Sequence, residues 1–224
     1  LNDIGTASVK ELCYFTGYSV AVITALEQKG VIELYDDEVL RTPYDDTLEC
    51  DSSEIILSDE QNNAFNGLLS LYNDSAPKGA LLYGVTGSGK TQVYLKLIDE
   101  VIKSDKGIIV MIPEISLTPQ MLLLFYKRYG DKVAVFHSSL SLGQRLDEWK
   151  RIKRGEARIA IGTRSAVFAP FEKLGLVIID EEQEHTYKSE MTPRYHAKEV
   201  AQYRVGCHNG LLLLSSATPS IDTY

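Results

Sequence analysis

The stretch ALLYGVTGSGKT, residues 80–91, joins a short apolar run to a glycine-rich turn that ends in Lys90 and Thr91. It matches the pattern G-x-x-x-x-G-K-[ST] in full, and a segment of helical length follows it. Glycines let backbone N–H groups surround a phosphate, and the N-terminus of the next helix adds a favourable dipole. The stretch therefore predicts a strand, a phosphate-binding loop and a helix. The predicted nucleotide-binding residues of the loop are Gly84, Thr86, Gly87, Ser88, Gly89, Lys90 and Thr91.

Apolar runs of strand length recur along the chain, and amphipathic segments of helical length lie between them. The runs are apolar on both faces, as strands are when helices cover both sides of a parallel sheet. This alternation predicts a doubly wound α/β domain, whose ligands bind at the carboxyl ends of the strands. The predicted strands are residues 80–85, 107–113, 132–138, 157–163, 174–180 and 210–217, and the predicted helices are residues 90–104, 117–129 and 143–154.

The run LGLVIIDEEQEH, residues 174–185, places four acids directly after an aliphatic strand. We expect Asp180 to approach Thr91 from the end of a neighbouring strand, so that both hold Mg²⁺ while Lys90 reaches the β and γ phosphates. Glu181 would polarise the attacking water as general base. Two carboxylates this close repel each other unless a cation lies between them. The predicted catalytic residues are thus Lys90, Asp180 and Glu181; an acidic surface loop is the alternative.

Upstream of the loop, SDEQNNAF places Gln61 just before a helix. A glutamine amide donates and accepts hydrogen bonds at once, so it can pair with the edge of an adenine. A single glutamine is weak evidence, and a surface residue is the alternative.

The N-terminal part has a different character from the rest. Residues 1–50 hold three Lys or Arg against ten Asp or Glu, whereas the chain as a whole has a net charge of −8. Two helical segments, SVKELCYFTG and one capped by Ser19 that ends at Gly30, precede an alternating hairpin, VIELYDDEVLRTP. This order predicts a partial winged-helix module over residues 1–43, a linker over 44–54 and the α/β domain over 55–224. The acidic charge favours a docking or spacer role over base reading.

Bulk composition excludes several classes of protein. No run of about 18 apolar residues is present, and the N-terminus lacks a signal-peptide pattern, so we expect a soluble, intracellular protein. The three cysteines show no paired spacing for zinc or redox chemistry. The basic stretch KRIKRGEAR, residues 150–158, has two open interpretations, a solvated helix face and a surface that faces nucleic acid.

Together with GVTGSGKT, the segments VIIDEEQEHTYKSEMTPRYHAKEVAQYR, IPEISLTPQ, HSSLSLGQRLDEWKRIKRGEARIAIGTRSAVFAP and LLSSATPS resemble the PriA-type family of primosomal replication-restart helicases. These are bacterial DNA helicases of superfamily 2. The resemblance covers nearly all of residues 53–224. It implies a RecA-like ATP-binding lobe, ATP and Mg²⁺ as cofactors, and 3′-to-5′ translocation on DNA.

The resemblance also implies roles for residues at matching positions. Gln61 matches the adenine-reading glutamine, and Gln183 stands where the family usually has a histidine, so that position cannot become a cation. His185–His196 resembles an aromatic-rich loop that senses single-stranded DNA; packing residues are the alternative for its two tyrosines. The implied DNA-binding residues are Thr118, Thr163, Arg164, Tyr187, Lys188, Arg194 and Tyr195, near Glu114, Gln120 and Ser165. The implied coupling residues are Gln183, Ser216, Ala217 and Thr218.

We further expect the chain to be a fragment, part of a winged helix plus a first motor lobe, that binds nucleotide with little turnover. The resemblance implies forked and single-stranded DNA, primosome proteins and single-strand-binding protein as partners, a monomer, no membrane and a bacterial cytoplasmic location. It also implies zinc in the intact family member, though not in this fragment. Two alternatives remain: an interaction or regulatory module that docks through the acidic winged helix, and a related recombination or repair translocase.

Overall fold

The computed structural model describes residues 9–34, 53–74, 76–221 and 223. The chain divides into two compact units, Leu1–Val39 and Leu40–Tyr224, each of which is considered by itself. None of the described helices is both long and apolar enough to cross a membrane.

The first unit contains two short helices, α1 (Val9–Thr16) and α2 (Val20–Gln28). Gly17 and Gly30 follow them with φ of 71° and 69°, a conformation that glycine adopts without strain at helix ends. Ser19 occupies the position before α2, but its side chain makes no capping bond, contrary to expectation. Residues 35–43 of the predicted hairpin and 44–52 of the predicted linker lie outside the described residues, so the winged-helix assignment stays a prediction.

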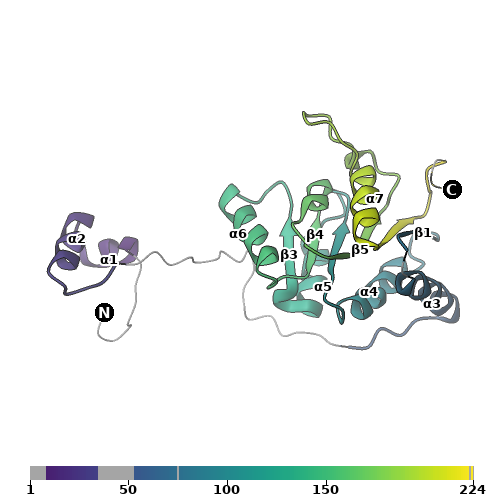
Figure 1. Ribbon diagram of the computed structural model, residues 1–224, viewed down its shortest axis with the longest axis horizontal. Helices are drawn as coiled ribbons and strands as arrows, with labels where there is room; N and C mark the ends of the chain where they lie inside the picture. The colour runs from purple at the N-terminus through teal and green to yellow at the C-terminus, as the bar shows by residue number, and fades with distance from the viewer. Residues whose placement is uncertain (1–8, 35–52, 75, 222, 224) are drawn as a thin grey trace. The chain divides into compact units, whose positions relative to one another are not determined.

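The second unit is built on a six-stranded, wholly parallel sheet in the order β1-β6-β5-β2-β4-β3 (Figure 1). The predicted α/β class with a parallel sheet is confirmed, and each predicted strand is present within a few residues of its expected bounds. The strands are β1 (Lys78–Tyr83), β2 (Gly107–Met111), β3 (Val133–Phe136), β4 (Ile159–Gly162), β5 (Leu174–Asp180) and β6 (Leu211–Ser216).

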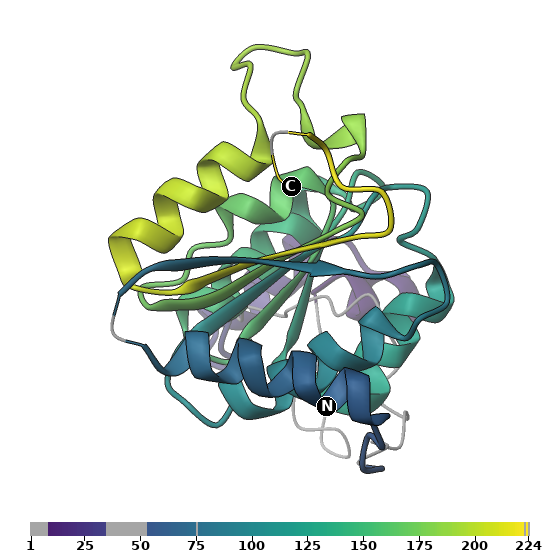
Figure 2. The same cartoon turned by 90° about the vertical axis from the view of Figure 1, so that its right-hand side faces the viewer.

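Helices lie on both faces of the sheet (Figure 2), and alternate residues of each central strand face two separate cores. On one face Ile108 and Ile178 pack with α3 (Asp59–Asn73), α4 (Lys90–Val101) and α5 (Pro119–Tyr129). On the other face Ile109 and Ile179 pack with α7 (Ala197–His208) and the 3₁₀ segment η2 (Arg164–Phe168). Helix α6 (Leu142–Lys153) packs beside β3 and adds Ile152 to the second core. Two-sided burial is what the continuous apolar runs predict.

Two features differ from the prediction. Strand β1 forms an edge of the sheet and is only partly buried, with Tyr83 59% exposed, because β6 covers it on one side alone. Helix α7 was not among the predicted helices. Its buried residues, Ala197, Ala201 and Val205, form a narrow stripe at four-residue spacing in an otherwise polar segment, so its periodicity is weak.

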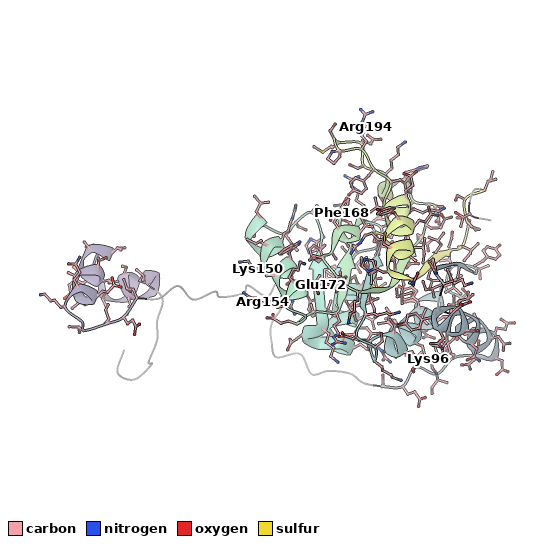
Figure 3. All side chains as sticks on the ribbon, viewed as in Figure 1. Lys96, Lys150, Arg154, Phe168, Glu172 and Arg194 are labelled. Atoms are coloured by element: carbon pink, nitrogen blue, oxygen red, sulfur yellow. The ribbon has the colours of Figure 1, made fainter. Side chains whose placement is uncertain are left out.

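The basic stretch at residues 150–158 is neither wholly a solvated helix face nor wholly a surface free to face nucleic acid. Arg151 is buried and donates to Glu148, whose second contact is the backbone N–H of Val135. Arg158 pairs with Asp105, and Lys153 lies 3.7 Å from Glu172. Lys150 and Arg154 lie on α6 and just after it (Figure 3). Acidic partners therefore offset much of the charge that the sequence shows.

The buried ion pair gives a first prediction. Arg151→Met leaves the Glu148 carboxylate, which has no exposed surface, without its counter-ion, and we expect a loss of about 3 to 5 kcal/mol of unfolding free energy at pH 7. Lys153→Met, which removes an exposed amine, should change stability by less than about 0.5 kcal/mol. Urea titrations of both variants measure this, and equal losses would contradict a special role for Arg151.

The same variant carries a pH signature. Burial raises the pKa of Glu148 above its ordinary value against the opposing charge of Arg151. A raised folded-state pKa stabilises the fold below the unfolded pKa of about 4.3, and this contribution is lost as the pH rises through the folded-state pKa. Removing Arg151 raises that pKa further. The penalty of Arg151→Met should therefore be smaller at pH 5 than at pH 8.

Candidate functional site

The phosphate-binding loop lies between β1 and α4, as predicted. Gly87 and Gly89 have φ of 80° and 79°, the left-handed region that favours glycine. A Cβ at Gly89 would lie 2.4 Å from Nε2 of Gln61, whereas a Cβ at Gly87 would meet nothing within 4 Å. The Nζ atom of Lys90 donates to the carbonyls of Gly84 (2.7 Å) and Val85 (3.2 Å). The loop is thus closely packed where it meets α3 and open at Gly87, the shape that a phosphate cradle needs.

Gln61 lies inside the first turn of α3, not before it. Its Oε1 accepts from the backbone N–H of Ser58 (2.9 Å), and the Ser58 hydroxyl accepts from the N–H of Gln61 (3.3 Å), which completes a capping box. Its Nε2 donates to the carbonyl of Ser88 in the phosphate-binding loop (2.9 Å). The amide therefore joins α3 to the loop, and its contact with an adenine stays a prediction.

Asp180 ends β5. We had expected this strand to lie directly beside β1, but β6 lies between them. The Asp180 carboxylate accepts from Ser215 on β6 (2.8 Å), from Tyr94 on α4 (3.3 Å) and from the backbone of Glu181 (3.1 Å). Burial raises its pKa, and the bond from Ser215 opposes this. Burial, followed by the charge of Asp180, also raises the pKa of the Tyr94 phenol. Nothing in the sequence pattern had pointed to Tyr94 or Ser215.

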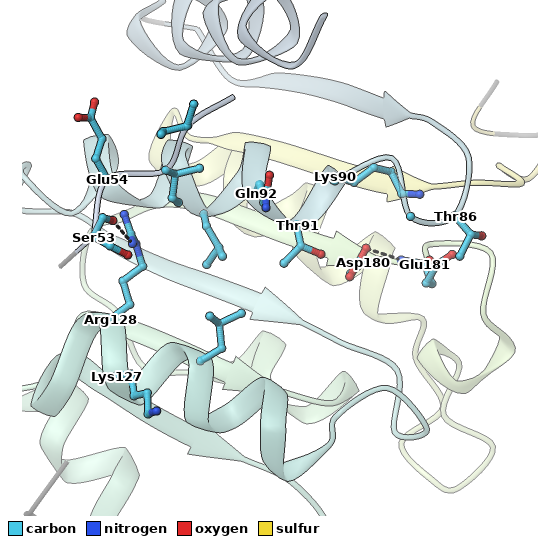
Figure 4. Close-up of a pocket in the computed structure, with 16 residues that line it drawn as sticks. Ser53, Glu54, Thr86, Lys90, Thr91, Gln92, Lys127, Arg128, Asp180 and Glu181 are labelled. Carbon is cyan, nitrogen blue, oxygen red and sulfur yellow. Dashed lines mark hydrogen bonds between the residues drawn. The ribbon is translucent and has the colours of Figure 1, made fainter. Parts of the chain in front are cut away.

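A pocket of about 800 Å³ connects the loop with the acids (Figure 4). Thr91 and Asp180 both line it, so a hydroxyl and a carboxylate oxygen are available together, as Mg²⁺ requires. The far end is formed by residues 53–56, where Arg128 donates to the carbonyl of Ser53 (2.9 Å) and to Asp99. The residues that line the pocket are Ser53, Glu54, Ile55, Ile56, Thr86, Gly87, Gly89, Lys90, Thr91, Gln92, Leu95, Leu124, Lys127, Arg128, Asp180 and Glu181.

Gln183 links the acids to the end of β6. Its Nε2 donates to Glu181 (2.9 Å), and its Oε1 accepts from the hydroxyl of Ser216 (2.5 Å). The Ser216 oxygen in turn accepts from the backbone N–H of Thr218 (3.0 Å). Glu181 has a φ of 46°, unusual for a residue other than glycine. A neutral amide therefore bridges these two positions as both donor and acceptor.

The two tyrosines of the loop 185–196 occupy different environments. Tyr187 is 1% exposed, and its hydroxyl lies 2.5 Å from the carbonyl of Asp180 and 3.1 Å from that of Met111. Its ring is buried in the second core and has no free face on which a base could stack, so Tyr187 is a packing residue in this structure. Tyr195 is half-buried and contacts Phe168 edge to face at 5.0 Å between centroids. Burial raises the pKa of Tyr195, against the nearby charge of Arg164.

The other predicted DNA-binding residues lie beyond the carboxyl ends of the strands. Thr118 caps α5 by accepting from Met121 (3.3 Å), and Thr163 precedes η2. Arg164 donates to the carbonyl of Lys188 (2.9 Å), so part of its guanidinium holds the loop. Arg194 lies on the part of that loop that projects from the lobe (Figure 3). These side chains share one edge of the sheet, although the sequence had not shown that Arg164 binds the loop.

Comparison with known proteins places this geometry in a family. Residues 58–224 match the DEAD/DEAH box helicase family. The chain is 49% identical over 214 residues to "Replication restart protein PriA" of Bacillus subtilis, a match that covers 96% of this chain and 27% of that protein. It is 40% identical to the protein of the same name in Synechocystis, over 100% of this chain and 26% of that protein. The chain thus spans about a quarter of the length of these relatives.

Two solved structures share the fold. "Structure of RecG bound to three-way DNA junction" has a TM-score of 0.57 at 24% identity and covers 75% of this chain and 22% of that one. "Crystal structure of Pyrococcus furiosus Hef helicase domain" has a TM-score of 0.51 at 16% identity, over 72% of this chain and 32% of that one.

These matches confirm the resemblance to the replication-restart helicases that the motifs indicated. Because the family match extends over most of its length, the chain belongs to the DEAD/DEAH box helicase family.

Proposed function

We propose that this chain is the ATP-binding lobe of a 3′-to-5′ DNA helicase that acts in the restart of stalled replication forks. One observation carries the proposal: the phosphate-binding loop, the Thr91 hydroxyl and the Asp180 carboxylate all line one pocket. The relatives named for replication restart support the biological role.

Four polar side chains in and beside the pocket, together with Gln183, have proposed tasks in ATP hydrolysis. Lys90 would leave the carbonyls of Gly84 and Val85 to neutralise the β and γ phosphates. Thr91 and Asp180 would hold Mg²⁺, which supplies positive charge to the phosphate oxygens. Glu181 would orient the attacking water and accept its proton. Gln183, which is hydrogen-bonded to both Glu181 and Ser216, would transmit a change in the position of Glu181 to Ser216.

The carboxyl edge of the sheet is the proposed path of single-stranded DNA. Thr118, Thr163 and Arg164 follow β2 and β4 at this edge, and the loop that carries Lys188, Arg194 and Tyr195 follows β5. Basic groups suit the phosphates, and the Tyr195–Phe168 pair offers aromatic surface for bases. Forked DNA, primosome proteins and single-strand-binding protein are the proposed partners; the relatives named for replication restart support a role on DNA.

Nucleotide binding tests the core of the proposal. We expect the chain to bind ATP in a magnesium-dependent manner, and Lys90→Ala to weaken binding about 10- to 100-fold, since charge-assisted bonds to phosphate are lost. Lys103→Ala, which removes an exposed amine whose partner among the described residues is the half-buried Glu100, is the matched control. Isothermal titration calorimetry measures both. Equal affinities for the two variants, or no magnesium dependence, would refute the proposal.

DNA binding tests the proposed strand path. Arg194→Ala should weaken binding of single-stranded DNA and reduce the slope of log affinity against log salt by about 0.7, because one phosphate contact is lost. Fluorescence anisotropy over a salt series measures this, with Lys103→Ala again as control. An unchanged slope would remove Arg194 from the path.

The burial of Tyr187 predicts a different outcome for that residue. Tyr187→Phe keeps the ring but removes the buried hydroxyl that contacts the carbonyls of Asp180 and Met111, so we expect a loss of about 0.5 to 1.5 kcal/mol of stability. Affinity for single-stranded DNA should stay within about twofold, whereas Tyr195→Ala should lower it about tenfold or more. A loss of DNA affinity in Tyr187→Phe with unchanged stability would restore a sensing role for Tyr187.

A further inference from the structure

Glu182 lies between Glu181 and Gln183 in sequence, yet it does not line the nucleotide pocket. It is 4% exposed, and its carboxylate turns inward. One oxygen, Oε1, accepts from the backbone N–H of Ser220 (2.7 Å). The other, Oε2, accepts from the hydroxyls of Ser220 (3.3 Å) and Thr223 (3.0 Å) and from the ammonium of Lys198 (3.2 Å). A group with these contacts is not placed to bind the metal.

This one carboxylate joins three segments of the lobe. The backbone N–H of Glu182 donates to the carbonyl of Ser215, so the turn after β5 also pairs with the end of β6 (3.1 Å). Lys198 comes from the first turn of α7, and Ser220 and Thr223 follow β6. A buried charge is tolerated only when it is paired and hydrogen-bonded throughout. Burial would raise the pKa of Glu182, but the bonds from Ser220, Thr223 and Lys198 together hold it below its ordinary value.

The same turn holds the segment after β6 at two points. Gln183 accepts from Ser216 at one end of that segment, and Glu182 accepts from Ser220 at the other. Glu181, which lines the pocket, precedes Glu182 and Gln183 in the same turn and has a φ of 46°. Any movement of Glu181 therefore moves a turn that is bonded to both ends of residues 216–220.

We infer that Glu182, with Lys198 as its counter-ion, is a positioning residue that couples the nucleotide pocket to residues 216–221 and to Thr223. The inference deepens the proposed function, on which it rests, by naming the contact through which the nucleotide state reaches the segment after the coupling motif. Glu182 does not line the pocket, so its removal should separate nucleotide binding from the response of residues 216–221.

The test compares Glu182→Gln with wild type in the 224-residue chain. Glutamine keeps the volume and one acceptor but places an N–H donor against Lys198 and Thr223. Hydrogen exchange of a peptide spanning residues 215–221 is followed by mass spectrometry, without ligand and with Mg²⁺ plus a non-hydrolysable ATP analogue. Glu184→Gln, which removes a carboxylate from the same turn, is the matched control, since no bond from Glu184 to residues 216–221 is seen.

We expect Glu182→Gln to speed exchange of this peptide about tenfold without ligand, as the loss of a charge-assisted bond implies. The analogue with Mg²⁺ should slow exchange of the peptide in wild type and in Glu184→Gln but not in Glu182→Gln. Calorimetry should show the same affinity for the analogue with Mg²⁺ in all three proteins, within about threefold. If Glu182 had only a structural role, Glu182→Gln would exchange faster without ligand, but the analogue with Mg²⁺ would still slow exchange of the peptide. That result would overturn the inference.

A fall in magnesium-dependent affinity in Glu182→Gln would overturn it as well, because Glu182 would then belong to the metal site. Lys198→Met and the double variant Glu182→Gln/Lys198→Met complete a double-mutant cycle. The double variant should exchange no faster than the faster of the two single variants, whereas additive effects would contradict a shared contact. If wild type itself binds no nucleotide, the proposed function fails, yet the ligand-free exchange rates still show whether Glu182 holds residues 216–221.

Discussion

The insertion of β6 between β1 and β5 is the constraint on which the site depends. Parallel pairing sets Tyr83, the last residue before the phosphate-binding loop, beside Ser216, and Asp180 beside Ser215. The N–H of Gly84 then donates to the carbonyl of Ser216 (3.2 Å). Three motifs that are far apart in sequence thus lie in one row at the carboxyl edge of the sheet. A shift of β6 by one residue would turn its side chains to the opposite face and separate them.

Around this row, polar side chains are buried only where their partners are complete. Asp180 has Ser215 and Tyr94, Glu182 has Lys198 and Ser220, and Gln183 has contacts on both sides. The consequence is a site whose adjacent carboxylates face different surroundings. Asp180 and Glu181 reach the pocket, and Glu182 turns inward to the segment after β6. Such fully satisfied networks are rigid, which suits the coupling proposed for Glu182.

The edge proposed for DNA is joined to the acids by backbone contacts. Arg164, in the motif after β4, holds the carbonyl of Lys188, and the neighbouring Tyr187 holds the carbonyl of Asp180. The loop 185–196 is therefore fixed at its start, while Arg194 and Tyr195 remain accessible further along. Its buried tyrosine supports the site, and its partly exposed tyrosine, with Phe168, presents aromatic surface.

The sequence by itself determined the class of fold, the glycine-rich loop between a strand and a helix, and the run of acids at the end of a buried strand. Apolar runs and the glycine pattern are local signals, because strand burial and loop geometry depend on neighbouring residues. The sequence could not determine the strand order, the inward turn of Glu182, the buried state of Arg151 and Tyr187, or helix α7 with its narrow apolar stripe. These depend on contacts between residues far apart in the chain, such as Tyr94 with Asp180 and Lys198 with Glu182. Only the tertiary structure decides them, since a side chain's partners are set by packing and not by its own neighbours in sequence.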